Sequence, residues 1–160
     1  MGSRDGGRMT AEPTHPALFE HSPWVEARAD AAPSSGDRHA DLMRVVHAAT
    51  QDEQLALIRA HPELAGKAAI DGTLTHASAS EQASAGLDRL TPEEFERFHA
   101  LNAAYRAAHQ MPFIICVRLT DKAGILAAME ARIANDTPTE IATALAEIGK
   151  ITKLRLEDAR

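Results

Sequence analysis

The chain has 160 residues, of which 44% are hydrophobic and 25% are charged, and its formal net charge is −6. This length and composition indicate a soluble globular protein with one core, and the acidic balance excludes a basic surface that follows nucleic acid. No apolar stretch approaches the ~20 residues of a transmembrane helix, so we expect no membrane partner.

Alanine is abundant and aromatic residues make up only 4% of the chain, a balance that favours packed helices. We therefore predict an all-α fold, a single compact bundle of about seven to eight helices spanning residues 17–160. Residues 1–16 are rich in glycine and polar groups, and we expect them to be disordered. The single cysteine, Cys116, cannot form an intramolecular disulfide, which is typical of a reducing compartment.

The first helix is predicted to begin with Ser22 as its N-cap and Pro23 as its first helical residue. His21, beside this cap, suits a structural role as well as a role in a site. A loop is expected over residues 31–36, and apolar residues on one face predict a second helix over 41–49.

A capping box at Thr50–Glu53 predicts the start of a third helix. Proline disfavours the α conformation in the residue before it, so Pro62 ends this helix near Arg59 and leaves His61 just past its C-terminus. The negative end of the helix dipole favours a protonated imidazole there. His61 is therefore a candidate proton donor, and the alternative is a surface histidine at a helix end.

Ser78 and Glu81 have the spacing of a capping box, which predicts a helix that begins near residue 79. Free N–H groups at such an N-terminus can also bind a substrate carboxylate. Glu81 thus has two interpretations, as part of the cap or as part of a site.

Thr91–Glu94 predicts another helix start, followed by apolar residues from Phe95 onward that we assign to the core, with an end near His109. Residues 112–117 form the one β-like run, and no second strand is predicted to pair with it. Its backbone groups need partners, which a flat heterocyclic ligand, neighbouring side chains or water would supply.

Asp121 is predicted to cap a helix that ends near Ala134, and Thr137–Glu140 repeats the cap pattern before the last helix. Arg155 lies near the end of the apolar stripe of that helix. Its guanidinium is either solvated or available to clamp a carboxylate.

Several catalytic motifs are absent from the sequence. It has no HExxH, CxxC, GxGxxG, P-loop or GxSxG pattern, so we expect no metal and no organic cofactor. What remains is acid–base chemistry without a cofactor, for which the candidates are His61, Glu81, Arg155 and a polar helix start.

Five segments occur in a recognisable order along the chain: FEHSPW, LIRAHPELAGKAA, the S-x-x-E-Q-x-x-A-G-L element of residues 78–87, FHALNAAYRAAHQMPFIICVR and KITKLRL. Together they resemble the 2-oxo-4-hydroxy-4-carboxy-5-ureidoimidazoline (OHCU) decarboxylase family over roughly residues 18–157. A series of motifs in order is far more specific than any one of them.

The resemblance implies an all-helical, cofactor-independent carboxy-lyase, commonly a homodimer, that converts OHCU to (S)-allantoin in urate degradation. It implies that His61 is the catalytic proton donor, and we expect Glu81 to hold its imidazole charged and oriented. Arg155, in the terminal LRL, matches the family's arginine that faces the substrate carboxylate, and Arg132 is a second basic candidate. The residues that the resemblance assigns to substrate binding are Pro62, Ser78, Ala79, Ser80, Glu81, Gln82, the backbone of Phe113, Ile114, Ile115, Cys116 and Val117, and Arg155.

Two departures from the family pattern stand out. The stretch before FEHSPW looks unlike the family's helical lead, and Met111 replaces an aromatic residue that often precedes the Pro-Phe pair. The C-terminus is not a peroxisomal address, so we expect a bacterial cytoplasmic enzyme. Two alternatives stay open: a non-enzymatic interaction domain that uses 113–117 as a contact surface, and the same fold acting on a related ureido acid.

Overall fold

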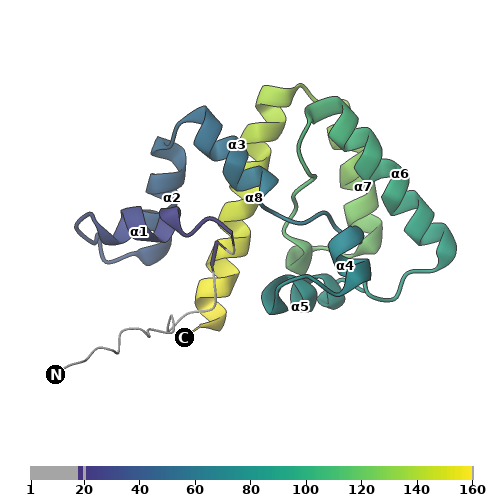
Figure 1. The fold of residues 1–160 in the computed structure, drawn as a ribbon, viewed down its shortest axis with the longest axis horizontal. Coiled ribbons are helices and arrows are strands. Elements are labelled where there is room, and N and C mark those ends of the chain that lie inside the picture. Colours follow the sequence, from purple (N-terminus) through teal and green to yellow (C-terminus); the bar gives the residue numbers. More distant parts are fainter. Residues whose placement is uncertain (1–17, 20, 160) are drawn as a thin grey trace.

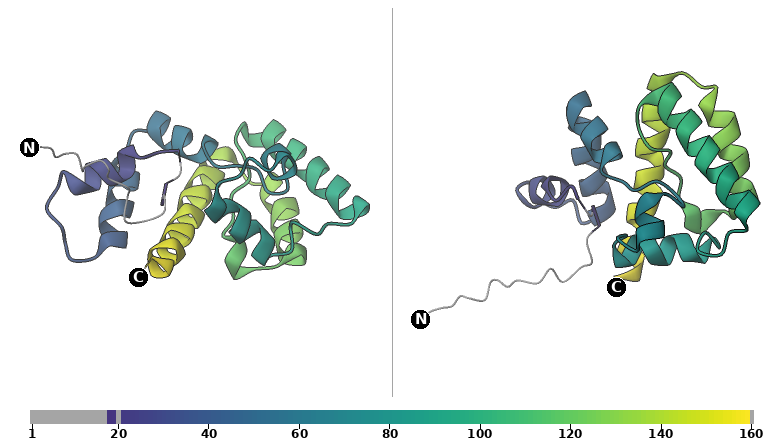
Figure 2. Two further views of the ribbon diagram at one scale, coloured as in Figure 1. Left: turned by 60° about the horizontal axis from the view of Figure 1, so that its bottom comes forward. Right: turned by 45° about the vertical axis from the view of Figure 1, so that its right-hand side comes forward.

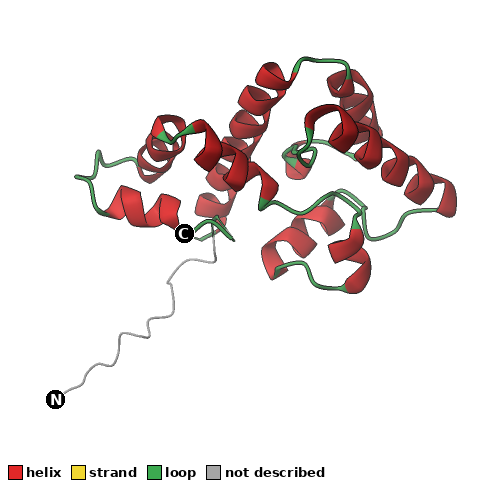
Figure 3. Ribbon diagram, turned by 45° about the horizontal axis from the view of Figure 1, so that its top comes forward, coloured by secondary structure: helices red, strands yellow, loops and turns green. Residues whose placement is uncertain are grey.

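The structure is a computed structural model that describes residues 18, 19 and 21–159. These residues form eight α-helices and a short 3₁₀ helix, with no strand among them (Figure 3), so the predicted all-α class is confirmed. The expected disordered segment 1–16 lies outside the described residues, and the domain limit at 17 stays a prediction. The elements are α1 (Trp24–Asp30), α2 (Arg38–Ala48), α3 (Gln51–Arg59), α4 (Lys67–Asp71), α5 (His76–Ser84), α6 (Pro92–His109), η2 (Val117–Leu119), α7 (Lys122–Ile133) and α8 (Thr137–Asp158).

The long helix α8 runs through the middle of the molecule (Figure 1). Helices α2 and α3 pack on one side of it, with α1 against α2, whereas α6 lies along α7 and also contacts α8 on the other side (Figure 2). Helix α5 packs against η2 below this pair. None of the described helices combines the length and the apolar character that a membrane span requires.

One hydrophobic cluster joins the two sides. It contains fully buried side chains from α2, α3, α6, α7 and α8, among them Leu42, Ile58, Phe98, Ile125 and Ile148. Burial of a side chain of this size contributes about 1.5–3 kcal/mol. The packing of helical stripes around α8 therefore provides a rigid frame for the residues between the helices.

Three of the predicted helix starts are confirmed. Thr50 and Thr91 each form a complete capping box with a glutamate three residues later, and the side chain of Asp121 accepts from the Gly124 N–H at 2.8 Å. In each case the capping residue has an extended backbone, and its side chain pairs an amide that the helix leaves unpaired.

Other predicted starts were wrong by one to three residues. Asp37 caps α2, four residues before the predicted first residue, and Asp136 rather than Thr137 caps α8. Helix α1 begins at Trp24 without a side-chain cap from Ser22, which is buried. In the segments before α2 and α8 a second capping residue stands nearby, since Asp41 follows Asp37 and Thr137 follows Asp136.

Two further predictions, one about a helix cap and one about a core residue, are wrong. Thr75, not Ser78, caps α5, and its hydroxyl accepts from the Ser78 N–H at 3.2 Å. Ser78 therefore lies inside the first turn and is buried, and its amide is not available to a ligand. Phe95, predicted to lie in the core, has 37% of its surface exposed.

Candidate active site

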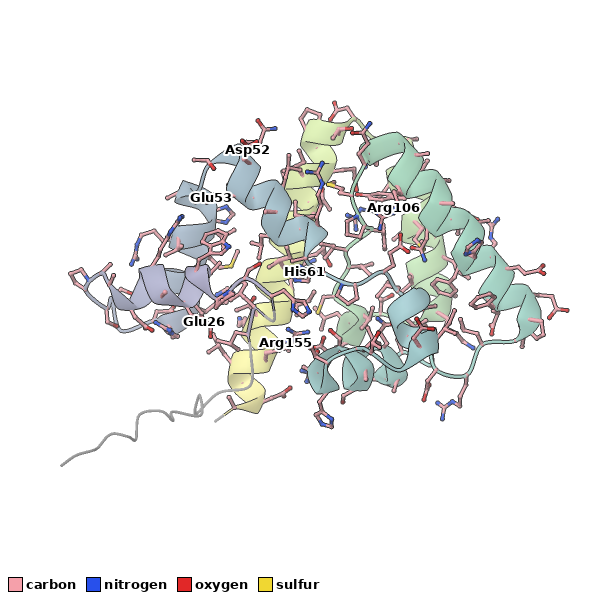
Figure 4. The ribbon with its side chains drawn as sticks, viewed as in Figure 1. Glu26, Asp52, Glu53, His61, Arg106 and Arg155 are labelled. Atoms are coloured by element: carbon pink, nitrogen blue, oxygen red, sulfur yellow. The ribbon has the colours of Figure 1, made fainter. Side chains whose placement is uncertain are left out.

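A cavity, here called the site cavity, lies where the end of α3, the helix α5, the segment after α6 and the last part of α8 meet. In Figure 4, His61 at the end of α3 lies beside Arg155 of α8, near the centre of the molecule. The space measures about 480 Å³, counting the solvent at its mouth. Its lining consists of His61, Pro62, Leu64, Ser78, Glu81, Gln82, Phe113, Ile114, Ile115, Cys116, Val117, Arg118, Ile151 and Arg155.

The position of His61 follows from the proline after it. The helix α3 ends just before His61, as predicted, and the His61 N–H donates to the Ile58 carbonyl at 3.1 Å. The Leu57 carbonyl, which the helix would otherwise leave unpaired, accepts from the ring atom Nδ1 at 2.9 Å. Because a carbonyl oxygen only accepts, Nδ1 carries a hydrogen, and Nε2 is the ring atom that exchanges a proton.

The loop after this histidine is held by two buried amides. Gln82 accepts from the Ala65 N–H at 2.9 Å and donates to the Glu63 carbonyl at 3.4 Å, while Asn102 donates to the Leu64 carbonyl at 2.9 Å. Ala65 has a φ of 52°, in the left-handed region that non-glycine residues rarely adopt. Side chains of α5 and α6 thus stabilise a strained backbone next to the cavity.

Glu81 and Arg155 form a two-pronged ion pair across the cavity wall. Arg155 Nε and Nη2 donate to the two carboxylate oxygens at 2.8 and 2.7 Å, and Nη1 donates to the Leu18 carbonyl at 3.3 Å. The two side chains are only 14% and 6% exposed. Both oxygens of Glu81 bind Arg155, while Nδ1 of the His61 ring binds the Leu57 carbonyl, so the expected action of Glu81 on the imidazole stays a prediction.

The segment 112–116 forms neither a helix nor a strand, and its last residue, Cys116, has an extended backbone. Arg132 Nη1 donates to the Ile114 carbonyl at 2.8 Å, and the Cys116 N–H donates to Glu147 Oε1 at 2.9 Å. The guanidinium of Arg132 also lies 4.3 Å from the centroid of the Phe113 ring. Side chains from α7 and α8 therefore take the place of a second strand, as one of the alternatives for this segment anticipated.

Arg132 itself does not line the site cavity. It is buried behind the segment 112–116, where Nε donates to Glu140 Oε1 at 2.8 Å and Nη2 has no hydrogen-bond partner. Tyr105 donates to the same carboxylate at 2.6 Å and Asn135 to its other oxygen at 2.9 Å. Burial raises the pKa of Glu140, but these hydrogen bonds outweigh it and hold that pKa below its ordinary value. The second basic candidate is thus a structural residue.

Two further polar groups line the cavity, the Cys116 thiol and the Arg118 guanidinium. Burial raises the pKa of the Cys116 thiol, which keeps it protonated at neutral pH. Arg118 lines the mouth of the cavity, and its guanidinium donates to the Asp158 carboxylate at 2.6 and 3.2 Å.

Most of the predicted site residues are brought together by the fold. Ala79 and Ser80 are exceptions: both are exposed and neither lines the site cavity. Ser80 lies instead in a second depression, here called the outer groove, which shares Glu81, Arg118 and Arg155 with the site cavity.

Three lining residues were missed, namely Leu64, Arg118 and Ile151. Arg118 directly follows the 113–117 run and Ile151 lies one helical turn before Arg155, so adjacency to predicted site residues was the available signal. Among the described residues, no group of three or more histidine, cysteine, aspartate or glutamate side chains is placed to hold a metal ion.

The chain is similar in sequence to several known proteins. The sequence profile described as OHCU decarboxylase matches residues 9–157. The chain is 39% identical to the 2-oxo-4-hydroxy-4-carboxy-5-ureidoimidazoline decarboxylase of Haloferax volcanii, over 88% of this chain and 83% of that protein. It is 42% identical to the protein of the same name from Halalkalicoccus jeotgali, over 88% of this chain and 80% of that protein.

A solved structure shares the fold. A crystal structure of OHCU decarboxylase in the presence of (S)-allantoin superimposes with a TM-score of 0.69, at 21% sequence identity, and the match covers 86% of this chain and 90% of that one.

Proposed function

The chain belongs to the OHCU decarboxylase family, and from this premise we propose that it decarboxylates OHCU to (S)-allantoin, the last step from urate, with His61 as the proton donor. The observation that carries the proposal is the convergence on one cavity of a histidine held by its ring, a buried carboxylate–guanidinium pair and the backbone of residues 113–117. This arrangement supports acid–base chemistry on a small, flat, polar ligand.

The proposed chemistry begins with loss of CO₂ from the bound substrate. The electron pair left behind forms a double bond to the carbon that bears the ureido group, and the electrons of the neighbouring C=N bond move onto the ring nitrogen. That nitrogen takes up the proton that the substrate hydroxyl releases as it becomes a carbonyl. His61 then donates the proton on Nε2 to one face of the carbon that bears the ureido group, and delivery from one side produces a single enantiomer. The bond from Nδ1 to the Leu57 carbonyl supports this role, because it leaves Nε2 as the exchanging atom.

The other walls are proposed to bind and orient the substrate. The segment after α6 offers backbone groups of Phe113–Val117 to the polar edges of the ring, and Pro62, Ser78 and Gln82 limit its position from the α3 and α5 sides. Glu81 is proposed to act through Arg155, by fixing the guanidinium against the cavity wall. A positioned substrate converts the proton transfer into an effectively unimolecular step.

A coupled assay tests the proposal. Urate, urate oxidase and hydroxyisourate hydrolase generate OHCU, and the protein is then added while absorbance and optical rotation are recorded. We expect faster decay of the last intermediate and optically active allantoin. Decay at the spontaneous rate would contradict the proposed activity and favour a non-enzymatic interaction domain, and turnover of only a related ureido acid would change the substrate.

We further propose that the protein is a cytoplasmic homodimer. The apolar surface between α4 and α6, where Ile70 and Phe95 are 63% and 37% exposed, is of the kind that oligomers cover. The free thiol of Cys116 fits a reducing compartment. Light scattering of the wild-type protein and of Ile70→Asp tests the dimer, and cell fractionation tests the location.

A further inference from the structure

Two arginines, Arg118 and Arg155, line the site cavity, and each forms an ion pair with a carboxylate. The two ion pairs differ in how deeply they are buried. Arg155 is 6% exposed, and it binds the largely buried Glu81 through two hydrogen bonds and the Leu18 carbonyl through a third. If Arg155 turned to a ligand, a buried carboxylate would lose its counter-ion, which is costly. The positive charge of Arg155 is therefore already balanced by a carboxylate of the protein.

The ion pair of Arg118 with Asp158 is more exposed to solvent. Its side chain is 30% exposed and its partner Asp158 is 56% exposed. Ion pairs between exposed side chains contribute little to stability, since water solvates both partners well when they separate. An incoming anion can thus replace Asp158 as the partner of Arg118 at small cost.

The position of Arg118 connects the solvent with the site. It lines both the site cavity and the outer groove, whereas Asp158 lines only the outer groove. The 3₁₀ helix η2 fixes its backbone, through bonds from the Leu119 N–H to the Cys116 carbonyl at 3.1 Å and from the Thr120 N–H to the Val117 carbonyl at 3.2 Å. The charge therefore sits next to the segment that frames the cavity.

The electrostatics agree with this position. The bond to Asp158 raises the pKa of Arg118 further above its ordinary value, and the negative charge of Glu81 adds to the effect. Glu81 is a cavity residue, so the charge on Arg118 interacts with charges inside the site as well as with Asp158 outside it.

We propose that Arg118 binds the carboxylate of the substrate at the mouth of the cavity, and that Asp158 is its counter-ion in the empty enzyme. The proposal rests on the proposed function, because it assumes an anionic substrate that loses its carboxylate there. Arg155, the arginine that the sequence analysis placed at the substrate, is then part of the cavity wall, and Glu81 compensates its positive charge. Arg118 is then the residue that selects substrates bearing a carboxylate at that edge.

The test uses two variants that break the same ion pair from opposite ends. Arg118→Gln removes the substrate's partner, and we expect KM for OHCU to rise about tenfold with kcat changed much less, the pattern of lost uniform binding. Asp158→Asn removes a competitor for Arg118, so we expect KM to fall below the wild-type value. Added salt should raise KM of the wild type and leave KM of Arg118→Gln nearly constant.

The control breaks another exposed ion pair, that of Arg97 and Glu130, which lies outside the site cavity. Arg97→Gln should leave KM and its salt dependence unchanged. If Arg118→Gln and Asp158→Asn change KM in the same direction, the pair is merely structural and the role of Arg118 is overturned while the enzyme remains a decarboxylase. Failure of the wild-type protein to accelerate OHCU decay overturns the proposed function itself, and this inference with it.

Discussion

At the scale of single residues, the site depends on where His61 places its two ring nitrogens. The bond to the Leu57 carbonyl fixes the tautomer and the orientation of the ring, since the acceptor is a backbone atom of the preceding helix turn. In the same cavity, Glu81 compensates the charge of the buried Arg155.

The first prediction concerns this imidazole. His61→Asn removes the proposed proton donor, and a positioned general acid contributes roughly 10²–10⁴-fold in rate. We expect kcat for OHCU decarboxylation to fall by about that factor while the circular dichroism spectrum stays unchanged. His47→Asn, an exposed histidine of α2, is the matched control and should retain full activity. Wild-type kcat in His61→Asn would rule out the assigned role.

The second prediction concerns the buried ion pair. Glu81→Gln leaves the guanidinium of Arg155 buried without a counter-charge, and breaking a buried pair costs about 3–5 kcal/mol. We expect urea denaturation to show a loss near the lower end of that range, because glutamine keeps one acceptor. The exposed pair of Arg97 and Glu130 provides the comparison, and Glu130→Gln should cost less than about 1 kcal/mol. Equal losses in both variants would contradict the importance of burial.

At the scale of elements, the site combines one helix end with two helix faces. Helix α3 ends beside the cavity at His61, whereas α5 contributes the face that carries Ser78, Glu81 and Gln82, and α8 the face that carries Arg155. The end of α3 follows from the local rule for the residue before a proline. The core holds the helices in place, so that these faces and this end meet at one cavity.

The third prediction tests this helix end. In Pro62→Ala the α conformation becomes accessible to His61. The His61 backbone N–H can then donate to the Leu57 carbonyl, and it would replace Nδ1 of the ring as the donor to that carbonyl. Small displacements of a reacting group cost on the order of 10²-fold in rate, and we expect a loss of that size in kcat without loss of helicity. Nuclear magnetic resonance of the imidazole nitrogens reports the change of tautomer directly.

Its control is Pro138→Ala, since Pro138 lies in the first turn of α8, where a proline is compatible with the helix and no site residue depends on it. We expect its kcat to match the wild type. A Pro62→Ala variant with normal kcat and an unchanged Nδ1 signal would show that the proline does not control the ring.

At the scale of the whole molecule, carboxylates with lowered pKa values connect distant parts of the chain. The bond from Arg28 lowers the pKa of Glu53 to about 2, with the Thr50 cap adding to the effect. The Thr91 cap, with Lys122, lowers the pKa of Glu94. Hydrogen bonds lower that of the buried Glu140. These contacts join α1 to α3, α6 to α7, and α6 and α7 to α8.

The fourth prediction follows from the direction of these shifts. The folded state binds protons on these carboxylates more weakly than the unfolded state, so protonation favours unfolding. Their contribution is fully present above the ordinary value of 4.5 and is lost as pH falls toward about 2. Urea midpoints should therefore decline below about pH 4.5 and change little between there and neutrality on account of these groups.

Glu53→Gln should flatten part of this decline, because it removes the carboxylate whose pKa is lowered to about 2. A midpoint that is constant down to about pH 3 in the wild type would contradict the linkage.

Several features follow from the sequence alone, among them the all-α class and the helix boundaries at Thr50, Arg59 and Thr91. Proline at residue 62, the capping boxes at Thr50 and Thr91 and the apolar stripes act over a few residues, so local chemistry decides them. The ordered motifs, in turn, pointed to the family that the comparisons support.

The pairing of the charged groups, by contrast, depends on how the helices pack. Glu81 pairs with Arg155, Arg132 with Glu140 and Arg118 with Asp158, and each pair except Arg132–Glu140 joins residues at least 40 positions apart. Where two capping residues stood close together, as at Thr75 and Ser78, packing selected one of them. Such choices depend on the burial and distance of side chains that are remote in the chain, and no local pattern contains that information.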